Sequence, residues 1–293
     1  VWDPPIKDLA RDLDKVRYRE LSVDRPGTEA LIQRADEVFG DLLPPRIQGS
    51  FWWTMGLTWE AAKLIGLEQL MMYMYDDPEG LHRVMEWVSG EHMHFIKWFE
   101  TEGLLTRKDG AQSVGSGGLG CTDELPQPDW HEGGPARLID IWGFAESQET
   151  TGISPAMFEE FIVPYQVPLM EEFGLNCYGC CEPLHQRLDP VLRYIPRLRR
   201  ISGSPWVDQE IMKRKIGHDF IFSRKPNPTQ ICTMFNENQI RADVRQTLEI
   251  AGDGPLEIIM KDTHTVEDDP RRITRWVEIA LEEVDRYVSV DAA

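Results

Sequence analysis

The sequence lacks several features that would point to particular classes of protein. No apolar run approaches the ~20 residues that are needed to cross a bilayer. The segment Val1 to Pro5 has neither the basic start nor the apolar stretch of a secretory signal peptide. Positive charge is scarce, because 31 Lys and Arg residues face 50 Asp and Glu residues and the formal net charge is −19. This balance argues against binding to nucleic acid and against attachment to anionic lipid, since both need a basic face.

Cysteine is also scarce, and the chain has no glycine-rich dinucleotide fingerprint. The five cysteines are an odd number, and Cys180 and Cys181 are adjacent, which does not resemble a disulfide framework. We therefore expect a reducing, cytoplasmic setting. The stretch 115–118 is glycine-rich but opens a long loop instead of a helix, so a dinucleotide-binding fold is not favoured.

One pattern recurs six times along the chain: a short apolar or β-prone run is followed by an amphipathic helical stretch. This alternation predicts a parallel sheet covered by helices. Ser154 is a suitable N-cap for one of the helices, with Pro155 at its first position. The six runs are 46–53, 110–118, 174–180, 198–206, 219–226 and 256–264. The helices expected after them are 58–67 with 78–102, then 155–173, 188–194, 209–216, 237–251 and 269–287.

The residues that follow these runs favour a closed barrel over an open, doubly wound sheet. Side chains that could take part in catalysis or binding follow nearly every run. In an eight-stranded α/β barrel, such side chains collect on the carboxyl-terminal face. Six visible units then mean that the first two strands lie outside this chain. We therefore expect residues 1–293 to be a single barrel domain that is incomplete at its N-terminus. The segment 117–150 is too long for a simple connector, and we expect it to be a lid or a substrate-shaping loop.

Three stretches of the sequence carry a resemblance to a known family. They are Arg46 to Leu57 with the helix after it, Asp140 to Gly143 ahead of Phe158 to Tyr165, and Lys225 to Pro228. These stretches resemble the uroporphyrinogen decarboxylase superfamily, and the resemblance covers nearly the whole chain. It implies a (β/α)8 TIM barrel, of which this chain would hold the last six strands. It also implies one of two activities: decarboxylation of uroporphyrinogen without a cofactor, or zinc-dependent methyl transfer to a corrinoid.

In the methyltransferase branch of that superfamily, zinc ligands follow the fifth strand, often as His-x-Cys-Gly, and another Cys follows the eighth. At the equivalent positions this chain has Tyr178-Gly179-Cys180-Cys181-Glu182 and Lys261-Asp262-Thr263-His264. The positions match and the residues differ.

The first candidate site is the adjacent cysteines with the carboxylate that follows them. Thiolate, imidazole and carboxylate groups all bind zinc. We expect one of Cys180 and Cys181 to bind it, completed by Glu182 or His264. Another catalytic role and a tight turn with inert thiols are the open alternatives. A redox pair of Cys177 with Cys180 is not favoured, because no thioredoxin-like context surrounds it.

Charged residues after the last two runs form the second candidate site. Arg224 and Lys225 are expected to bind substrate carboxylates, with an ion pair to an acidic residue as the alternative. Asp262 and His264, together with Glu182, are the candidates for acid–base catalysis. The alternative for His264 is a structural role.

Three aromatic residues, Tyr178, Trp142 and Trp206, are expected to contact the substrate. The leading prediction is an enzyme that moves a methyl group from a small substrate, such as a methoxylated compound, to a separate corrinoid protein, with help from zinc. The second prediction is a decarboxylase that acts on a porphyrinogen or another small polycarboxylate. A barrel that only binds a ligand is the third.

Overall fold

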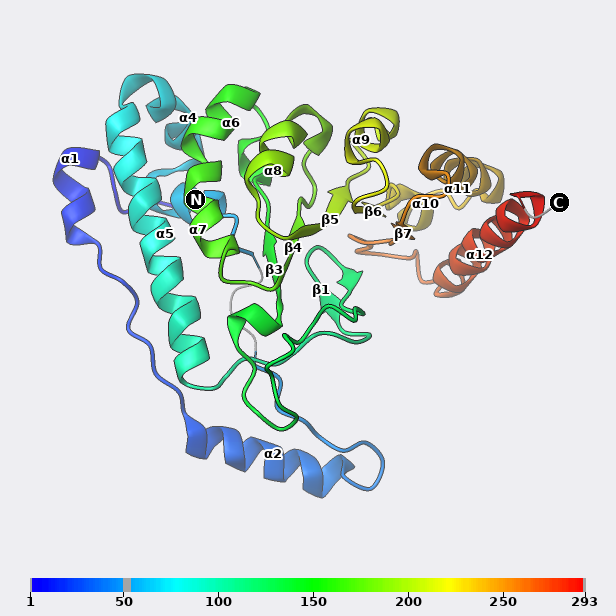
Figure 1. Ribbon diagram of the computed structural model, residues 1–293, viewed down its shortest axis with the longest axis horizontal. Helices are drawn as coiled ribbons and strands as arrows, with labels where there is room; N and C mark the ends of the chain where they lie inside the picture. Colours follow the sequence, from blue (N-terminus) through cyan, green and yellow to red (C-terminus); the bar gives the residue numbers. More distant parts are fainter. Residues whose placement is uncertain (1, 50–53, 292–293) are drawn as a thin grey trace.

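The computed structural model describes residues 2–49 and 54–291, and a five-stranded parallel sheet lies at its centre (Figure 1). Each strand pairs with the next one along the chain, and the register aligns Ala145 with Tyr178 and Gly203 with Arg224. The carboxyl ends of the strands therefore meet at one edge of the sheet. The strands are β3 (Trp142–Ala145), β4 (Leu175–Tyr178), β5 (Leu198–Gly203), β6 (Ile221–Arg224) and β7 (Leu256–Ile258).

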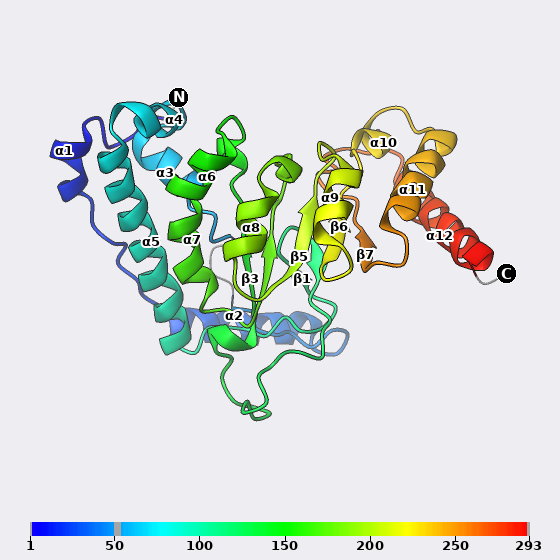
Figure 2. The same ribbon diagram turned by 45° about the horizontal axis from the view of Figure 1, so that its top comes forward.

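Helices cover one face of this sheet, with α6 to α9 side by side across it (Figure 2). Tyr178, Ile201 and Phe222 point into this layer and are fully or almost fully buried in the main hydrophobic core. Burial of such apolar area is the main stabilising term in folding. The helices after β3 are α6 (Pro155–Phe161), α7 (Val163–Met170), α8 (Leu188–Tyr194), α9 (Gln209–Ile216), α10 (Thr229–Cys232), α11 (Glu237–Ala251) and α12 (Arg271–Asp291).

A short antiparallel hairpin, β1 (Ser113–Val114) with β2 (Gly118–Leu119), covers part of the opposite face. Val114 packs with Trp142, Phe144 and Cys177 in a second hydrophobic cluster. We call this side of the sheet the inner face. Successive side chains of a strand point to opposite faces of the sheet, so every second side chain lies on the inner face and the others lie on the helix-covered face.

The N-terminal part forms a layer of helices beside β3. Met55 N–H donates to the carbonyl of Phe144 at 2.6 Å, which ties the segment before α3 to this strand. The helix α2 has no buried residue and lies apart from the other helices (Figure 1). The helices are α1 (Leu9–Asp12), α2 (Arg25–Phe39), α3 (Thr58–Ile65), α4 (Leu67–Asp76) and α5 (Pro78–Thr101). Single 3-10 turns are Leu13–Lys15, Leu138–Asp140, Gln148–Thr150 and Leu184–Gln186.

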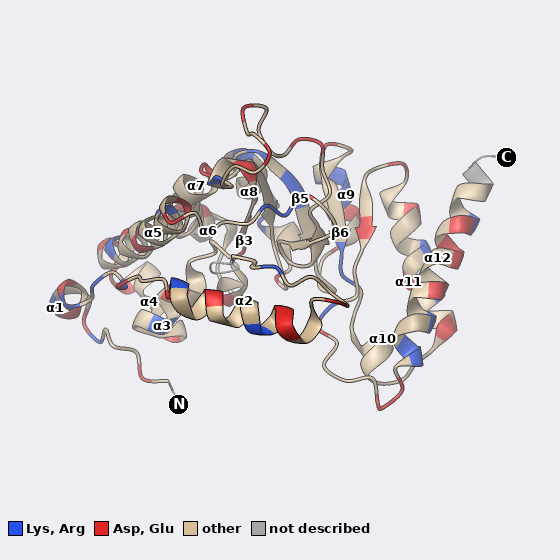
Figure 3. Ribbon diagram, turned by 90° about the horizontal axis from the view of Figure 1, so that it is seen from below, with Lys and Arg blue, Asp and Glu red and all other residues tan. Residues whose placement is uncertain are grey.

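The C-terminal helices α11 and α12 are joined by ion pairs. Arg241 Nη1 lies 2.8 Å from Glu283 Oε1, and Arg275 Nη2 lies 2.7 Å from Glu237 Oε2. Figure 3 shows charged residues of both signs along these two helices. Acidic side chains of these two helices are therefore matched by arginines of the neighbouring helix.

Most helix predictions are confirmed. The bounds predicted for α8, α9 and α11 agree with the structure at both ends. Ser154 caps α6 as predicted, because its Oγ accepts the N–H of Met157 at 3.2 Å. The single helix predicted over 155–173 is wrong: the chain breaks at Ile162 between α6 and α7. Pro164 lies directly after this break, and its missing N–H is tolerated in the first turn of α7.

Two strand predictions need correction. The run 110–118 forms the hairpin β1–β2 instead of a sheet strand, because the chain reverses at Gly115 and Gly117, both of which have positive φ. Of the run 46–53, residues 46–49 form no strand, and residues 50–53 lie outside the described residues. The edge strand β3 lies instead inside the segment 117–150, which was predicted to be a loop.

The remaining four runs contain β4, β5, β6 and β7, so the parallel α/β architecture is confirmed. Within the described residues the sheet ends at β3 on one side and at β7 on the other. The closed eight-stranded barrel stays a prediction. In the described ranges, none of the helices combines the length and the apolar character that spanning a membrane requires.

Candidate active site at the carboxyl ends of the strands

The loop that follows β4 is shaped by a glycine. Gly179 has a φ of +92°, and a Cβ there would lie 2.8 Å from Leu184 Cδ2 and 3.3 Å from Ser202 Cβ. Only glycine combines this backbone conformation with so little space. The chain therefore turns sharply at the end of β4, and Cys180 and Cys181 follow the turn.

This turn brings the cysteines to two residues that follow β7. We call Cys180, Cys181, Lys261 and Asp262 the thiol–lysine cluster. The two sulfur atoms lie 3.5 Å apart, and Lys261 Nζ lies 3.1 Å from Cys180 Sγ and 3.9 Å from Cys181 Sγ. Asp262 Oδ2 lies 3.7 Å from Lys261 Nζ and 3.8 Å from Cys181 Sγ. The cluster therefore surrounds one ammonium group with two sulfurs and a carboxylate.

Proton positions in the cluster follow from these contacts. A hydrogen bond from Cys180 lowers the pKa of Cys181 to about 7; burial opposes this shift and the Lys261 ammonium adds to it. The pKa of Cys180 is raised, because it shares that hydrogen bond with Cys181 and is buried. Burial lowers the pKa of Lys261, but the neighbouring sulfurs and Asp262 outweigh burial and the net pKa is raised. The cluster therefore favours a Cys181 thiolate beside a Lys261 ammonium.

Glu182, a predicted catalytic residue, holds the turn together. Its side chain is buried, and its Oε2 accepts the N–H of Cys180 at 2.8 Å. Its Oε1 accepts the N–H of Ser147, after β3, at 3.1 Å. Both carboxylate oxygens are thus engaged by backbone groups, and Glu182 positions the loops that follow β3 and β4.

Glu146 is a functional candidate that sequence reasoning missed. It follows β3 directly and is 1% exposed. Burial, together with the carboxylates of Glu182 and Glu149, raises the pKa of Glu146 to about 8. Its Oε2 accepts the N–H of Gln148 at 2.8 Å. Glu146 therefore holds a proton at neutral pH, and nothing in the local sequence marks this burial.

Glu146 gives a testable pH dependence. Its folded pKa of about 8 lies above the ordinary value of 4.5, so its favourable contribution is complete below the ordinary value and is lost as pH rises through 8. Glu146→Gln removes this titration. Between pH 5 and pH 9 the wild type is expected to lose ~2–4 kcal/mol more unfolding free energy than the variant. Urea unfolding at both pH values measures the difference, and equal losses in the two proteins would contradict the assignment.

Arg224 and Lys225 point to opposite faces of β6. Arg224 Nη1 donates to the carbonyl of Ser204 at 2.9 Å, and its Nη2 lies 3.6 Å from Asp243 Oδ1 of α11. Arg224 therefore forms an ion pair with an acidic residue on the helix side. This is the alternative that the sequence left open beside binding of a substrate carboxylate. Lys225 is 1% exposed, and its ammonium donates to the carbonyl of Ser223 at 3.1 Å. Burial lowers the pKa of Lys225 to about 8.

The inner face carries a charged group that the sequence did not single out. Arg200 Nε lies 2.7 Å from Glu257 Oε1, and the Arg200 guanidinium lies 4.8 Å from the ring centre of Trp142. Arg200 Nη1 also donates to Cys177 Sγ at 3.4 Å. The positive charges of Lys261 and Arg200 both act on Lys225. Because side chains along a strand alternate between the two faces of the sheet, the sequence of β5 could have predicted that Arg200 lies on the inner face.

The three predicted aromatic contacts are in different places. Tyr178 is fully buried on the helix side, where its hydroxyl donates to Gln166 Oε1 at 2.8 Å. Trp206 is 65% exposed after β5. Trp142 lies on the inner face and donates to the carbonyl of Gly120 at 3.1 Å. The structure therefore does not gather these rings around one substrate position.

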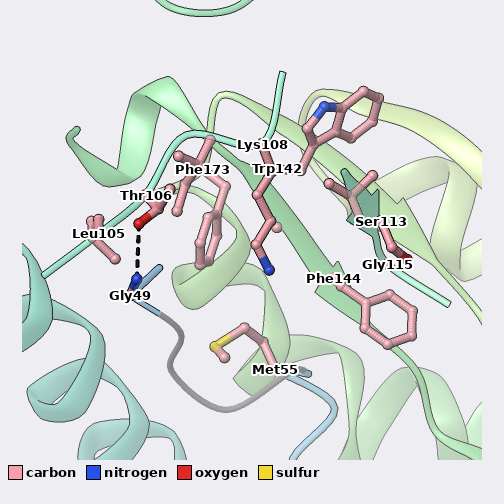
Figure 4. A pocket seen from close by; sticks show the side chains of 13 residues that line it. Gly49, Met55, Leu105, Thr106, Lys108, Ser113, Gly115, Trp142, Phe144 and Phe173 are labelled. Atoms are coloured by element: carbon pink, nitrogen blue, oxygen red, sulfur yellow. Dashed lines mark hydrogen bonds between the residues drawn. The ribbon is translucent and has the colours of Figure 1, made fainter. Parts of the chain in front are cut away.

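A cavity of about 320 Å³ opens beside β3 (Figure 4). Trp142, Phe144, Phe173 and Met55 line it, and the side chain of Lys108 points into it. None of the four residues of the thiol–lysine cluster lines this cavity. Among the described residues that line the cavity, Lys108 is the one charged residue, and the others are mostly apolar. The cavity therefore suits an apolar molecule with one anionic group.

The cluster does not fit zinc in this arrangement. Two sulfurs 3.5 Å apart suit Zn–S bonds of about 2.3 Å, but the Lys261 ammonium contacts both. His264 is exposed, and within the described residues no hydrogen bond or ion pair joins it to the cysteines. In residues 2–49 and 54–291, no three His, Cys, Asp or Glu side chains are grouped to hold a metal ion. The Lys261 ammonium thus lies beside both sulfurs, where a zinc ion bound by the two cysteines would have to lie.

Comparisons with known proteins agree with the fold. No family model matches the chain, and no curated protein matches it. Among solved structures, the chain is similar to a methyltransferase from Methanosarcina mazei, with a TM-score of 0.53 and 11% sequence identity. The alignment covers 97% of this chain and 71% of that chain. At this level of identity the likeness establishes a shared α/β fold.

Proposed function

We propose that this chain is an enzyme that removes a methyl group from a heteroatom of a small substrate, at the thiol–lysine cluster. The observation that carries the proposal is the Lys261 ammonium held between the sulfurs of Cys180 and Cys181 and the carboxylate of Asp262. Carboxyl ends of parallel strands are where α/β enzymes place their reacting groups. The similarity in fold to a methyltransferase supports methyl transfer as the reaction class.

The cluster supplies what a methyl ether needs when its carbon–oxygen bond breaks. The oxygen leaves with negative charge, and Lys261 Nζ can give it a proton. The side chain of Asp262 is 49% exposed and can pass a proton from water back to Lys261. The Cys181 thiolate keeps the lysine charged before the reaction. The methyl group itself goes to a separate acceptor, for which we propose a corrinoid protein.

Free cobalamin, reduced to its nucleophilic Co(I) state, can replace the unidentified partner in a direct test. The full chain is incubated with this acceptor and with a methoxylated aromatic acid, methanol, methylamine or methanethiol in turn. The absorbance of the cobalamin reports methylation. Methylation above the protein-free rate with one class of donor supports the proposal. Rates equal to those without protein for all four donors would contradict it.

Zinc stays a prediction with its own measurement. Metal analysis of the purified chain is compared with analysis of the double variant Cys180→Ser plus Cys181→Ser. One zinc per chain that is lost in the double variant would support zinc-assisted transfer, with Lys261 displaced from the sulfurs. Metal-free protein that still methylates the acceptor would remove zinc from the proposal.

The positive charge on the inner face favours a second candidate, a decarboxylase that acts on a small polycarboxylate. Arg200, Lys225 and Lys261 are three cations near one another in a chain with a net charge of −19. Such groups can bind carboxylates. Carbon dioxide released from uroporphyrinogen, with no methyl transfer in the cobalamin assay, would favour this candidate.

A further inference from the structure

We propose that Cys180 and Cys181 form a reversible dithiol–disulfide site that reacts with low-molecular-weight disulfides such as oxidised glutathione. The side chains of adjacent residues usually diverge, but these two sulfur atoms lie 3.5 Å apart. Cys181 is partly exposed and Cys180 is buried. Cys181 is therefore the thiol that an external disulfide reaches, and Cys180 is the thiol that resolves the product. The inference does not depend on methyl transfer.

The fold holds the two sulfurs together from both sides. Gly179 turns the chain, and the N–H of Cys180 is fixed on Glu182 Oε2 at 2.8 Å. On the other side, Lys261 Nζ spans the pair, at 3.1 Å from one sulfur and 3.9 Å from the other. A neighbouring ammonium stabilises a thiolate, which is the form that attacks disulfides. The geometry thus combines a nucleophile, a positive charge and a second thiol within reach.

The reaction is a balanced exchange of two electrons. The Cys181 thiolate attacks one sulfur of oxidised glutathione, the glutathione S–S bond breaks, and one glutathione leaves as a thiolate that takes a proton. Cys180 then loses its proton to solvent and attacks the Cys181 sulfur, which expels the second glutathione. One glutathione disulfide is reduced to two thiols, and two cysteine thiols are oxidised to one disulfide.

The product disulfide is expected to be strained and easily reduced. Adjacent Cα atoms are ~3.8 Å apart across a trans peptide, whereas most disulfides join Cα atoms ~4.4–6.8 Å apart. Strained disulfides have more oxidising potentials and return readily to thiols. Reduced glutathione should therefore reopen the bond, which makes the site reversible.

The experiment uses the full chain in a background in which the two other accessible cysteines are removed by Cys121→Ser and Cys232→Ser. Reduced protein is treated with oxidised glutathione, and intact mass and free thiols after denaturation are measured over time. The background protein is expected to lose two thiols and two hydrogens without keeping an adduct. Added Cys180→Ser should trap one glutathione, because no thiol is left to resolve it. Added Cys181→Ser should react at least ~10-fold more slowly, because the accessible thiolate is gone.

Cys177 is the internal control, since it is buried against Arg200 and should stay reduced throughout. Lys261→Met is expected to slow the first step by about 3- to 10-fold, because it removes the ammonium that lies 3.1 Å and 3.9 Å from the two sulfurs. A background protein that keeps all its thiols, or that keeps a glutathione adduct as stable as that of the Cys180→Ser variant, would overturn the proposal. Far-ultraviolet circular dichroism of each variant ensures that only folded protein is compared. None of these readouts depends on the cobalamin assay, so the two proposals fail separately.

Discussion

Replacing Lys261 by methionine is expected to lower the rate of methyl transfer by about 10²- to 10⁴-fold, the usual effect of removing a general acid. Lys261 is partly exposed and carries a proton at neutral pH, because its pKa is raised by the sulfurs and Asp262. Methionine has a similar length and no proton to give. The cobalamin assay with the preferred donor measures the loss, as kcat and KM separately.

Lys261→Arg is the matched control. Arginine keeps the positive charge but does not release its proton in the accessible pH range. It is therefore expected to keep KM within about threefold and to lower kcat nearly as much as methionine does. In the wild type, the raised pKa of Lys261 should keep the rate from falling until strongly alkaline pH. An arginine variant with full kcat would assign Lys261 a purely electrostatic role and would contradict proton transfer.

Replacing Glu182 by alanine is expected to lower the free energy of unfolding by about 3–5 kcal/mol, as for a buried charged group whose partners are left behind. The substitution leaves the N–H groups of Ser147 and Cys180 without their acceptor in the protein interior. It also removes a negative charge close to Arg187, which is 2% exposed. Urea unfolding at neutral pH measures the effect.

Two further variants make this result specific. Glu182→Gln keeps one oxygen as an acceptor and should lower the free energy of unfolding by only about 1–2 kcal/mol. Glu210→Ala changes an exposed glutamate of α9 and should stay within about 0.5 kcal/mol of the wild type. If Glu182→Ala unfolds at the same urea concentration as Glu210→Ala, Glu182 does not hold the two loops together. A stable Glu182→Gln variant with normal turnover would also exclude the catalytic role that the sequence predicted for this residue.

Elements with a strong local pattern could be predicted from the sequence. The helices α8, α9 and α11 have apolar residues at helical spacing. Two of them also begin with a capping residue, since Asp208 of α9 and Asn236 of α11 accept N–H groups of their helices. Spacing and capping act within a few residues, so the sequence contains them completely. The strands β4 to β7 were found for the same reason, as short β-prone runs between helices.

The strand β3 and the hairpin β1–β2 could not be assigned in this way. All four residues of β3 are buried, so the alternation that marks a half-buried strand is missing. The run 110–118 is β-prone, but the positive φ of Gly115 and Gly117 turns it back on itself. Whether such a segment joins the sheet depends on contacts with distant residues.

By itself, the sequence determined the parallel α/β class, the bounds of α8, α9 and α11, and the presence of two adjacent thiols after β4. Only the tertiary structure decided which groups meet those thiols: Lys261 and Asp262 reach them, whereas His264, three residues past Lys261, remains exposed. It also decided that Arg224 and Lys225 separate to opposite faces and that Glu146 keeps its proton. The physical reason is distance along the chain, since β4 and β7 are about 80 residues apart and only the shared edge of a folded sheet brings their ends within a few ångströms.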